Sequence, residues 1–99
     1  MNKNTKIPNE LIFGKYKLIK QIGEGSFGKV YSGINIKTKE PVAIKLEPRP
    51  LSLHFLKSEA LFLFTLKGVG IPVLKAFGKN KRYNILVAIL CMWIKKYYN

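Results

Sequence analysis

The stretch "IGEGSFGKVY", residues 22–31, places several glycines between residues that favour β-strands. The glycines are Gly23, Gly25 and Gly28. Glycine adopts backbone conformations that other residues avoid, so the pattern predicts a tight turn between two strands, with bare backbone N–H groups that can approach phosphates. The G-x-G-x-x-G spacing also occurs in dinucleotide-binding folds, but there it opens a helix, whereas here Val30 and Tyr31 continue as strand. A flexible hairpin with incidental glycines is the alternative.

Around this turn the chain alternates between strand-like runs and turn signals, with one helical segment. The expected strands are residues 15–23, 29–34, 41–47, 73–78 and 83–90. Residues 51–67 are rich in helix formers and stop at Gly68, which suits a helix end. The second half of this helix is apolar almost all round, so we expect partners on several of its sides. The predicted fold class is α+β: a five-stranded antiparallel sheet, whose first three strands form a meander, with one main helix.

A lysine stands in the third expected strand, inside the otherwise apolar run "VAIKL" of residues 42–46. A cation in such a setting needs an anionic partner, and Glu59 is the one acidic residue downstream of Glu47. We therefore predict an ion pair between Lys45 and Glu59 of the helix. The alternative is that Lys45 is one more surface lysine.

The chain is strongly basic, with 18 Lys and Arg against 5 Asp and Glu and a net charge of +13. Such a balance is typical of proteins that bind nucleic acid, an anionic membrane or acidic substrates. However, the lysines are dispersed along the chain and only two residues are arginine, the better reader of phosphates and bases. We therefore expect no specific nucleic-acid partner.

Cysteine content and hydropathy limit the cellular setting. The single cysteine, Cys91, excludes an intramolecular disulfide framework, and residues 1–10 contain no apolar run typical of a signal peptide. The longest apolar run, residues 85–94, is about half of what crosses a bilayer as a helix. We expect a cytoplasmic or nuclear protein without a membrane partner. His54 and Cys91 have no neighbours that indicate catalysis or a metal site.

The motifs together resemble the protein kinases, and within them the casein kinase I family. Val30 completes the G-x-G-x-x-G-x-V pattern, and Lys45 closes "VAIK" on the third strand. The resemblance covers about residues 14–90 and also rests on "GKYKLIKQIGEGSFGKVYSG", "VAIKLE", "GVGIP" at 68–72 and "YNILV". It implies the kinase N-lobe, the ATP-binding lobe, with the residue 51–67 segment as its C-type helix.

The resemblance implies a role for each matching position. Ile22 and Val30 would enclose the adenine with Ala43 beside it, and the backbone of residues 25–28 would fold over the phosphates. Lys45 would bind the α and β phosphates and be oriented by Glu59. Backbone groups of Ile89 and Cys91 would meet the adenine edge, after a small gatekeeper, Ala88. The implied ATP-binding residues are Ile22, Gly23, Glu24, Gly25, Ser26, Phe27, Gly28, Val30, Ala43, Lys45, Glu59, Ile89 and Cys91.

The catalytic elements of the family are absent from the sequence. A kinase needs the Asp of a catalytic loop and the Asp of D-F-G for magnesium, and this chain contains no Asp. We therefore place no catalytic residue in the chain and expect Mg²⁺ only together with the missing lobe. The chain alone is expected to be inactive, so its status as an enzyme stays open. Acidic or phosphorylated protein substrates are implied only for a complete kinase.

The last residues, "CMWIKKYYN", depart from the family pattern, which has a glycine-containing hinge and then an amphipathic helix. We divide the chain into an N-terminal extension (1–13), a kinase N-lobe (14–91) and an out-of-family tail (92–99). The tail is expected to come from intron read-through, a frameshift or a truncated gene copy, and a genuine short isoform is the alternative. An alternative hypothesis for the whole chain is a non-catalytic module that binds a partner through the helix and the tail.

Overall fold

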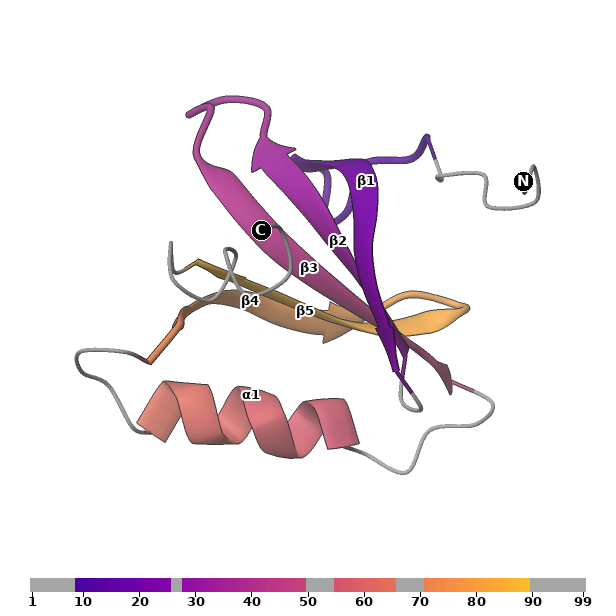
Figure 1. The fold of residues 1–99 in the computed structure, drawn as a ribbon, viewed down its shortest axis with the longest axis vertical. Helices are drawn as coiled ribbons and strands as arrows, with labels where there is room; N and C mark the ends of the chain where they lie inside the picture. Colours follow the sequence, from indigo (N-terminus) through magenta and orange to yellow (C-terminus); the bar gives the residue numbers. More distant parts are fainter. Residues whose placement is uncertain (1–8, 26–27, 50–54, 66–70, 90–99) are drawn as a thin grey trace.

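The structure is a computed structural model that describes residues 9–25, 28–49, 55–65 and 71–89 (Figure 1). Five strands and one helix follow one another along the chain. They are β1 (Tyr16–Gly25), β2 (Gly28–Asn35), β3 (Pro41–Pro48), α1 (Phe55–Thr65), β4 (Val73–Lys79) and β5 (Tyr83–Ile89). The predicted α+β class, with five strands and one helix, is confirmed.

All five strands join one antiparallel sheet in the order β1-β2-β3-β5-β4. The first three strands form the predicted meander, because short polar or glycine-rich turns join them. After α1 the chain enters β4 at the sheet edge and returns through β5, which lies between β3 and β4. The sheet twists strongly, so that β4 and β5 run across the direction of β1 (Figure 1).

The observed strand ends differ from the predicted ones by at most two residues. The predicted helix spans residues 51–67, whereas the described helix runs from Phe55 to Thr65. Residues 51–54 and 66–70, which hold His54 and the predicted helix end at Gly68, lie outside the described residues, as does the 92–99 tail.

Two clusters of buried side chains lie on opposite faces of the sheet, because successive residues of a strand point to opposite faces. The first is formed by Ile12, Tyr16, Leu18, Tyr31, Val42, Ile44, Leu46, Ile85 and Val87. The second is formed by Leu56 and Ala60 of α1 with Leu86 and Ala88 of β5. Ile12 belongs to the first cluster, so residues expected to be an N-terminal extension contribute to the core.

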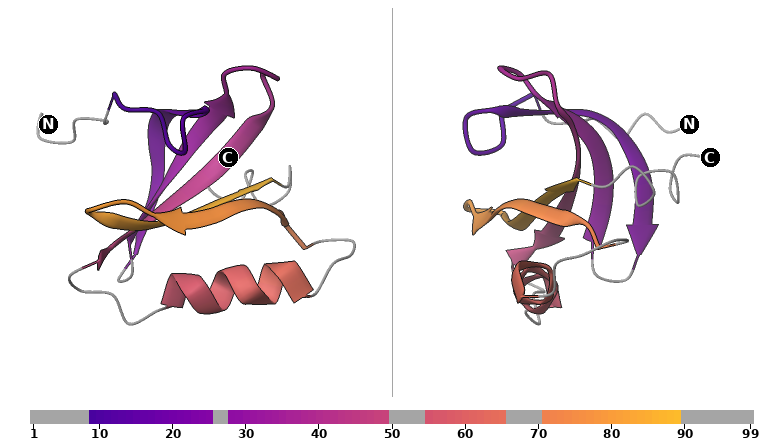
Figure 2. Two further views of the ribbon diagram at one scale, coloured as in Figure 1. Left: turned by 180° about the vertical axis from the view of Figure 1, so that it is seen from behind. Right: turned by 90° about the vertical axis from the view of Figure 1, so that its left-hand side faces the viewer.

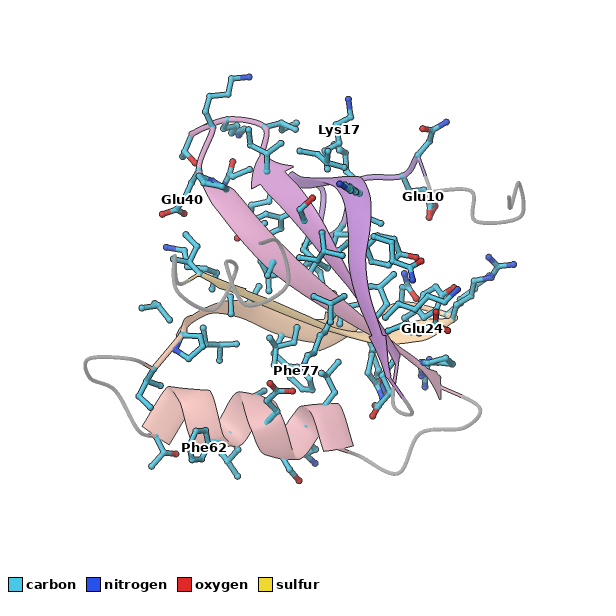
Figure 3. All side chains as sticks on the ribbon, in the orientation of Figure 1. Glu10, Lys17, Glu24, Glu40, Phe62 and Phe77 are labelled. Atoms are coloured by element: carbon cyan, nitrogen blue, oxygen red, sulfur yellow. The ribbon has the colours of Figure 1, made fainter. Side chains whose placement is uncertain are left out.

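The helix covers the second face and contacts β4 and β5, and Figure 2 shows it end-on beneath the sheet. Leu56 and Ala60 face the sheet, whereas Leu61 and Phe62 are 63% and 49% exposed. Figure 3 shows Phe62 on α1, clear of the sheet. Within the described part of the chain, α1 therefore packs through one side, and the expectation of partners on its other sides stays a prediction.

Candidate functional site

The glycine-rich stretch forms the end of the β1–β2 hairpin. Gly23 pairs with Val30, Glu24 with Lys29 and Gly25 with Gly28. The predicted strand–turn–strand arrangement is thus present up to its tip, and the two tip residues, Ser26 and Phe27, lie outside the described residues. The pairing is irregular between Gln21 and Gly23, which places Ile22 at a bulge.

Gly28 has a structural reason to be glycine that involves no ligand. Its φ is +148°, which residues with a side chain rarely adopt. A Cβ built there would overlap the Leu46 carbonyl oxygen of β3 and lie 3.1 Å from the carbonyl carbon. The bare backbone predicted from the sequence therefore allows the hairpin end to approach β3.

The predicted ion pair between β3 and α1 is present. The Lys45 ammonium donates hydrogen bonds to both carboxylate oxygens of Glu59, at 2.8 and 2.9 Å. The two side chains are 25% and 31% exposed, so the pair is partly shielded from water. Hydrogen bonds between ionised groups are stronger than neutral ones, and partial burial limits screening by salt.

The strands beside Lys45 bring several predicted residues onto the α1 face of the sheet. Residues directly opposite in an antiparallel pair share a face, and Lys45 lies opposite Val30 on one side and Leu86 on the other. Ala43, two residues earlier, lies opposite Ala88. Val30, Ala43 and Ala88 are buried, and the exposed fraction of Ala43 is 0%.

The other predicted residues are more dispersed. Glu24 is exposed, and its carboxylate accepts a long hydrogen bond of 3.4 Å from the Gln21 amide. Ile89 is half-buried at the end of β5, opposite Val73. Cys91 lies outside the described residues. The structure thus brings together Val30, Ala43, Lys45 and Glu59.

Glu47 is a buried charged residue that was not among the predicted site residues. It is only 4% exposed, although it is charged and stands near the end of β3. Its carboxylate accepts hydrogen bonds from the backbone N–H of Leu56, at 3.2 Å, and from the side-chain amide of Asn84, at 2.8 Å. The available signal was strand alternation, which puts Glu47 on the same face as Lys45 and therefore toward α1.

A surface cavity of about 630 Å³ lies away from these residues. Its lining consists of Glu10, Leu11, Ile12, Phe13, Lys79, Asn80, Lys81, Arg82 and Ile85. Ile12 and Ile85 belong to the core cluster on the face opposite α1. None of the predicted nucleotide contacts lines this cavity.

The residues that the structure describes bear on metal binding and on membrane insertion. Within them, no three His, Cys, Asp or Glu side chains gather into a group that could hold a metal ion. No described helix combines the length and the apolar character needed to cross a bilayer.

No protein-family model matches the chain. What the site can do must therefore be inferred from its geometry. Lys45 lies on the central strand β3 and is bound by the Glu59 carboxylate of α1. The neighbouring strand, β2, follows the glycine-rich turn.

Proposed function

We propose that the chain is the ATP-binding N-lobe of a casein kinase I-like serine/threonine kinase, which transfers phosphate from ATP to protein Ser or Thr in a complete protein. The observation that carries the proposal is the bidentate ion pair between Lys45 of β3 and Glu59 of α1. Kinases use such a strand lysine, paired with a helix glutamate, to hold the nucleotide phosphates.

Two further observations support this function. Gly23, Gly25 and Gly28 stand at the end of a β-hairpin, as in loops that cover the phosphates of a nucleotide, and not at the start of a helix. A five-stranded antiparallel sheet with one helix is also compatible with a kinase N-lobe. The positions of the motifs and the fold are therefore both compatible with a kinase N-lobe.

In the proposed role, the backbone of residues 25–28 covers the phosphates of ATP and Lys45 binds the α and β phosphates. Ile22, Val30 and Ala43 contact the adenine, whose edge meets the backbone at Ile89 and Cys91. Because Ala43 is fully buried, an adenine ring can reach it only after a rearrangement that uncovers this face. Mg²⁺, the catalytic Asp residues and the choice of acidic or phosphorylated substrates would come from the second lobe.

A lobe exchange tests the proposal. Residues 9–91, which include the core residue Ile12 and the proposed adenine contact Cys91, replace the N-lobe of an active casein kinase I, and phosphorylation of an acidic peptide is measured. We expect activity that Lys45→Met abolishes and that Lys75→Met retains, because Lys75 forms its ion pair with Glu40 and Lys45 forms its own with Glu59. A folded chimera that binds no ATP and transfers no phosphate would refute the proposal.

The isolated chain offers a second measurement. Because these 99 residues contain no Asp that could hold magnesium beside the phosphates, we expect ATP affinity no better than about millimolar, or roughly 4 kcal/mol of binding free energy. Calorimetry that showed micromolar binding dependent on Lys45 would contradict this expectation.

The cytoplasmic or nuclear location stays a prediction.

A partner-binding module is the second candidate, favoured by the exposed Leu61 and Phe62 on α1. Exposed apolar side chains in neighbouring positions are typical of contact surfaces. In this case, replacing both residues by serine would abolish association with the partner while the chain stays folded. A kinase N-lobe without such a partner would keep its ATP binding in the same variant.

A further inference from the structure

Glu47 links three elements through one buried carboxylate. It stands on β3, two residues after Lys45, and its two oxygens accept hydrogen bonds from Leu56 of α1 and from Asn84 of β5. Burial of a charged group is costly unless the group is hydrogen-bonded, and these contacts offset that cost. The carboxylate therefore joins β3 to α1 and β5, which a glutamate on the surface would not do.

The contact to Leu56 is made at the start of the helix. Leu56 is the second residue of α1, and the first N–H groups of a helix have no acceptor within it. The first turn of α1 contains no acidic residue of its own. Glu47 supplies both an acceptor and a negative charge there, and both stabilise a helix N-terminus.

The Glu47–Leu56 contact runs beside the Lys45–Glu59 pair. Lys45 and Glu47 share a face of β3 because they are two residues apart, which is about 7 Å along a strand. Leu56 and Glu59 are three residues apart on α1, which is about 4.5 Å along a helix and brings them to neighbouring positions on its surface. The packing of Leu56 and Ala60 on β5 holds α1 against the sheet, and the two polar contacts add two points at which the helix is fixed relative to β3.

We propose that Glu47 is a positioning residue, which holds the start of α1 so that Glu59 meets Lys45. Asn84 supports it from β5 by donating to the other carboxylate oxygen. The significance of this device for nucleotide binding rests on the proposed function, but the positioning itself does not. Its loss would weaken the ion pair without any change to Lys45 or Glu59.

The test is a double-mutant cycle for the Lys45–Glu59 pair, built from Lys45→Met and Glu59→Gln and measured by urea unfolding of the full chain. The cycle is run in the parent, in Glu47→Ala and in Glu40→Ala, a matched control that removes a partly exposed acid paired with Lys75. In the parent and the control we expect a clear coupling. In Glu47→Ala the ratio of unfolding constants that expresses the coupling should fall to about one.

Unchanged coupling in Glu47→Ala would overturn the proposal, even if that variant is less stable, because a purely structural role lowers stability alone. Glu47→Gln should restore part of the coupling, since an amide oxygen can still accept from Leu56 while the Asn84 amide turns over. If Glu47→Ala does not fold, Asn84→Ala removes only the donor to the other carboxylate oxygen, so the coupling should fall below that of the parent, and an unchanged coupling would overturn the proposal. No step uses nucleotide, so a failure of ATP binding and a failure of positioning are separate results.

Discussion

Val30 of β2 lies directly opposite Lys45 of β3 in the antiparallel register. Val30 ends the glycine-rich motif, and Lys45 ends the "VAIK" motif, so two sequence patterns separated by a polar loop meet on one face of the sheet. Glu59 then reaches the same place from α1. The proposed nucleotide site depends on this convergence.

The Lys45–Glu59 pair should stabilise the fold more than the ion pair of Lys75 and Glu40. The second pair is a single contact of 3.5 Å, and its side chains are more exposed. We expect a coupling of about 1 kcal/mol for Lys45–Glu59 and below about 0.5 kcal/mol for Lys75–Glu40 in urea-unfolding cycles. Added salt should reduce the second coupling more. Equal couplings would show that shielding by α1 contributes nothing.

Gly28→Ala should destabilise the chain more than Gly14→Ala. Both glycines have positive φ, but a Cβ at Gly14 would meet nothing within 4 Å, whereas one at Gly28 would overlap the Leu46 carbonyl. We expect losses of about 1 kcal/mol for Gly14→Ala and about 2 kcal/mol or more for Gly28→Ala. Thermal and urea unfolding measure both. A smaller loss at Gly28 would contradict the close approach of the hairpin to β3.

Leu86→Ala should loosen α1 from the sheet. Leu86 is fully buried and packs in the cluster that contains Leu56 and Ala60 of the helix. We expect a loss of about 2–5 kcal/mol in the free energy of unfolding, because the truncation leaves a cavity. The same change at exposed Leu61 should cost within about 0.5 kcal/mol. If the two variants unfold alike, the helix does not pack on the sheet through this face.

Tyr31 should make the fold sensitive to alkaline pH. Burial raises the pKa of the Tyr31 hydroxyl above its ordinary value of 10.0, and Tyr83 and Glu24 add to the shift. The unfolded chain then loses this proton at lower pH than the folded chain. The contribution of Tyr31 is therefore fully present below its unfolded pKa and is lost as pH rises through about 10 and beyond.

Tyr31→Phe checks this linkage. The phenylalanine variant should lose less stability than the parent when unfolding is compared at about pH 8 and about pH 10.5. The parent at the lower pH serves as the reference for any packing change caused by the substitution. Parallel stability curves for the two chains would contradict the raised pKa.

Sequence patterns were sufficient for the sheet, the helix and the central ion pair. The strands were predictable because turn residues separate runs of β-forming residues, and the end of β1 was marked by its glycines. The Lys45–Glu59 pair was predictable because a cation within an apolar strand needs an anion, and few acids were available. These features could be predicted from local sequence patterns and from the need of Lys45 for an anionic partner.

Other features depend on contacts between distant residues, which no local pattern reports. In the sequence, Glu47 is a polar residue near the end of a strand. Its hydrogen-bond partners, Leu56 of α1 and Asn84 of β5, lie far from it along the chain. Ile12 precedes the first strand, yet it packs in the sheet core. The apolar residues of α1 suggested contacts all round, whereas the arrangement of the sheet selects one side and leaves Leu61 and Phe62 exposed.

Part of the excess of lysine lies on the two outer strands of the sheet, β1 and β4. In the part of the chain that the structure describes, β1 and β4 form the edges, and both have irregular pairing with their neighbours. Exposed lysines lie along both, Lys17 and Lys20 on β1 and Lys75 and Lys79 on β4. An unpaired strand edge is a template for joining sheets between molecules, and irregular pairing and positive charge oppose such joining. We therefore expect the lysines on β1 and β4 to oppose pairing of these edges between two copies of the chain.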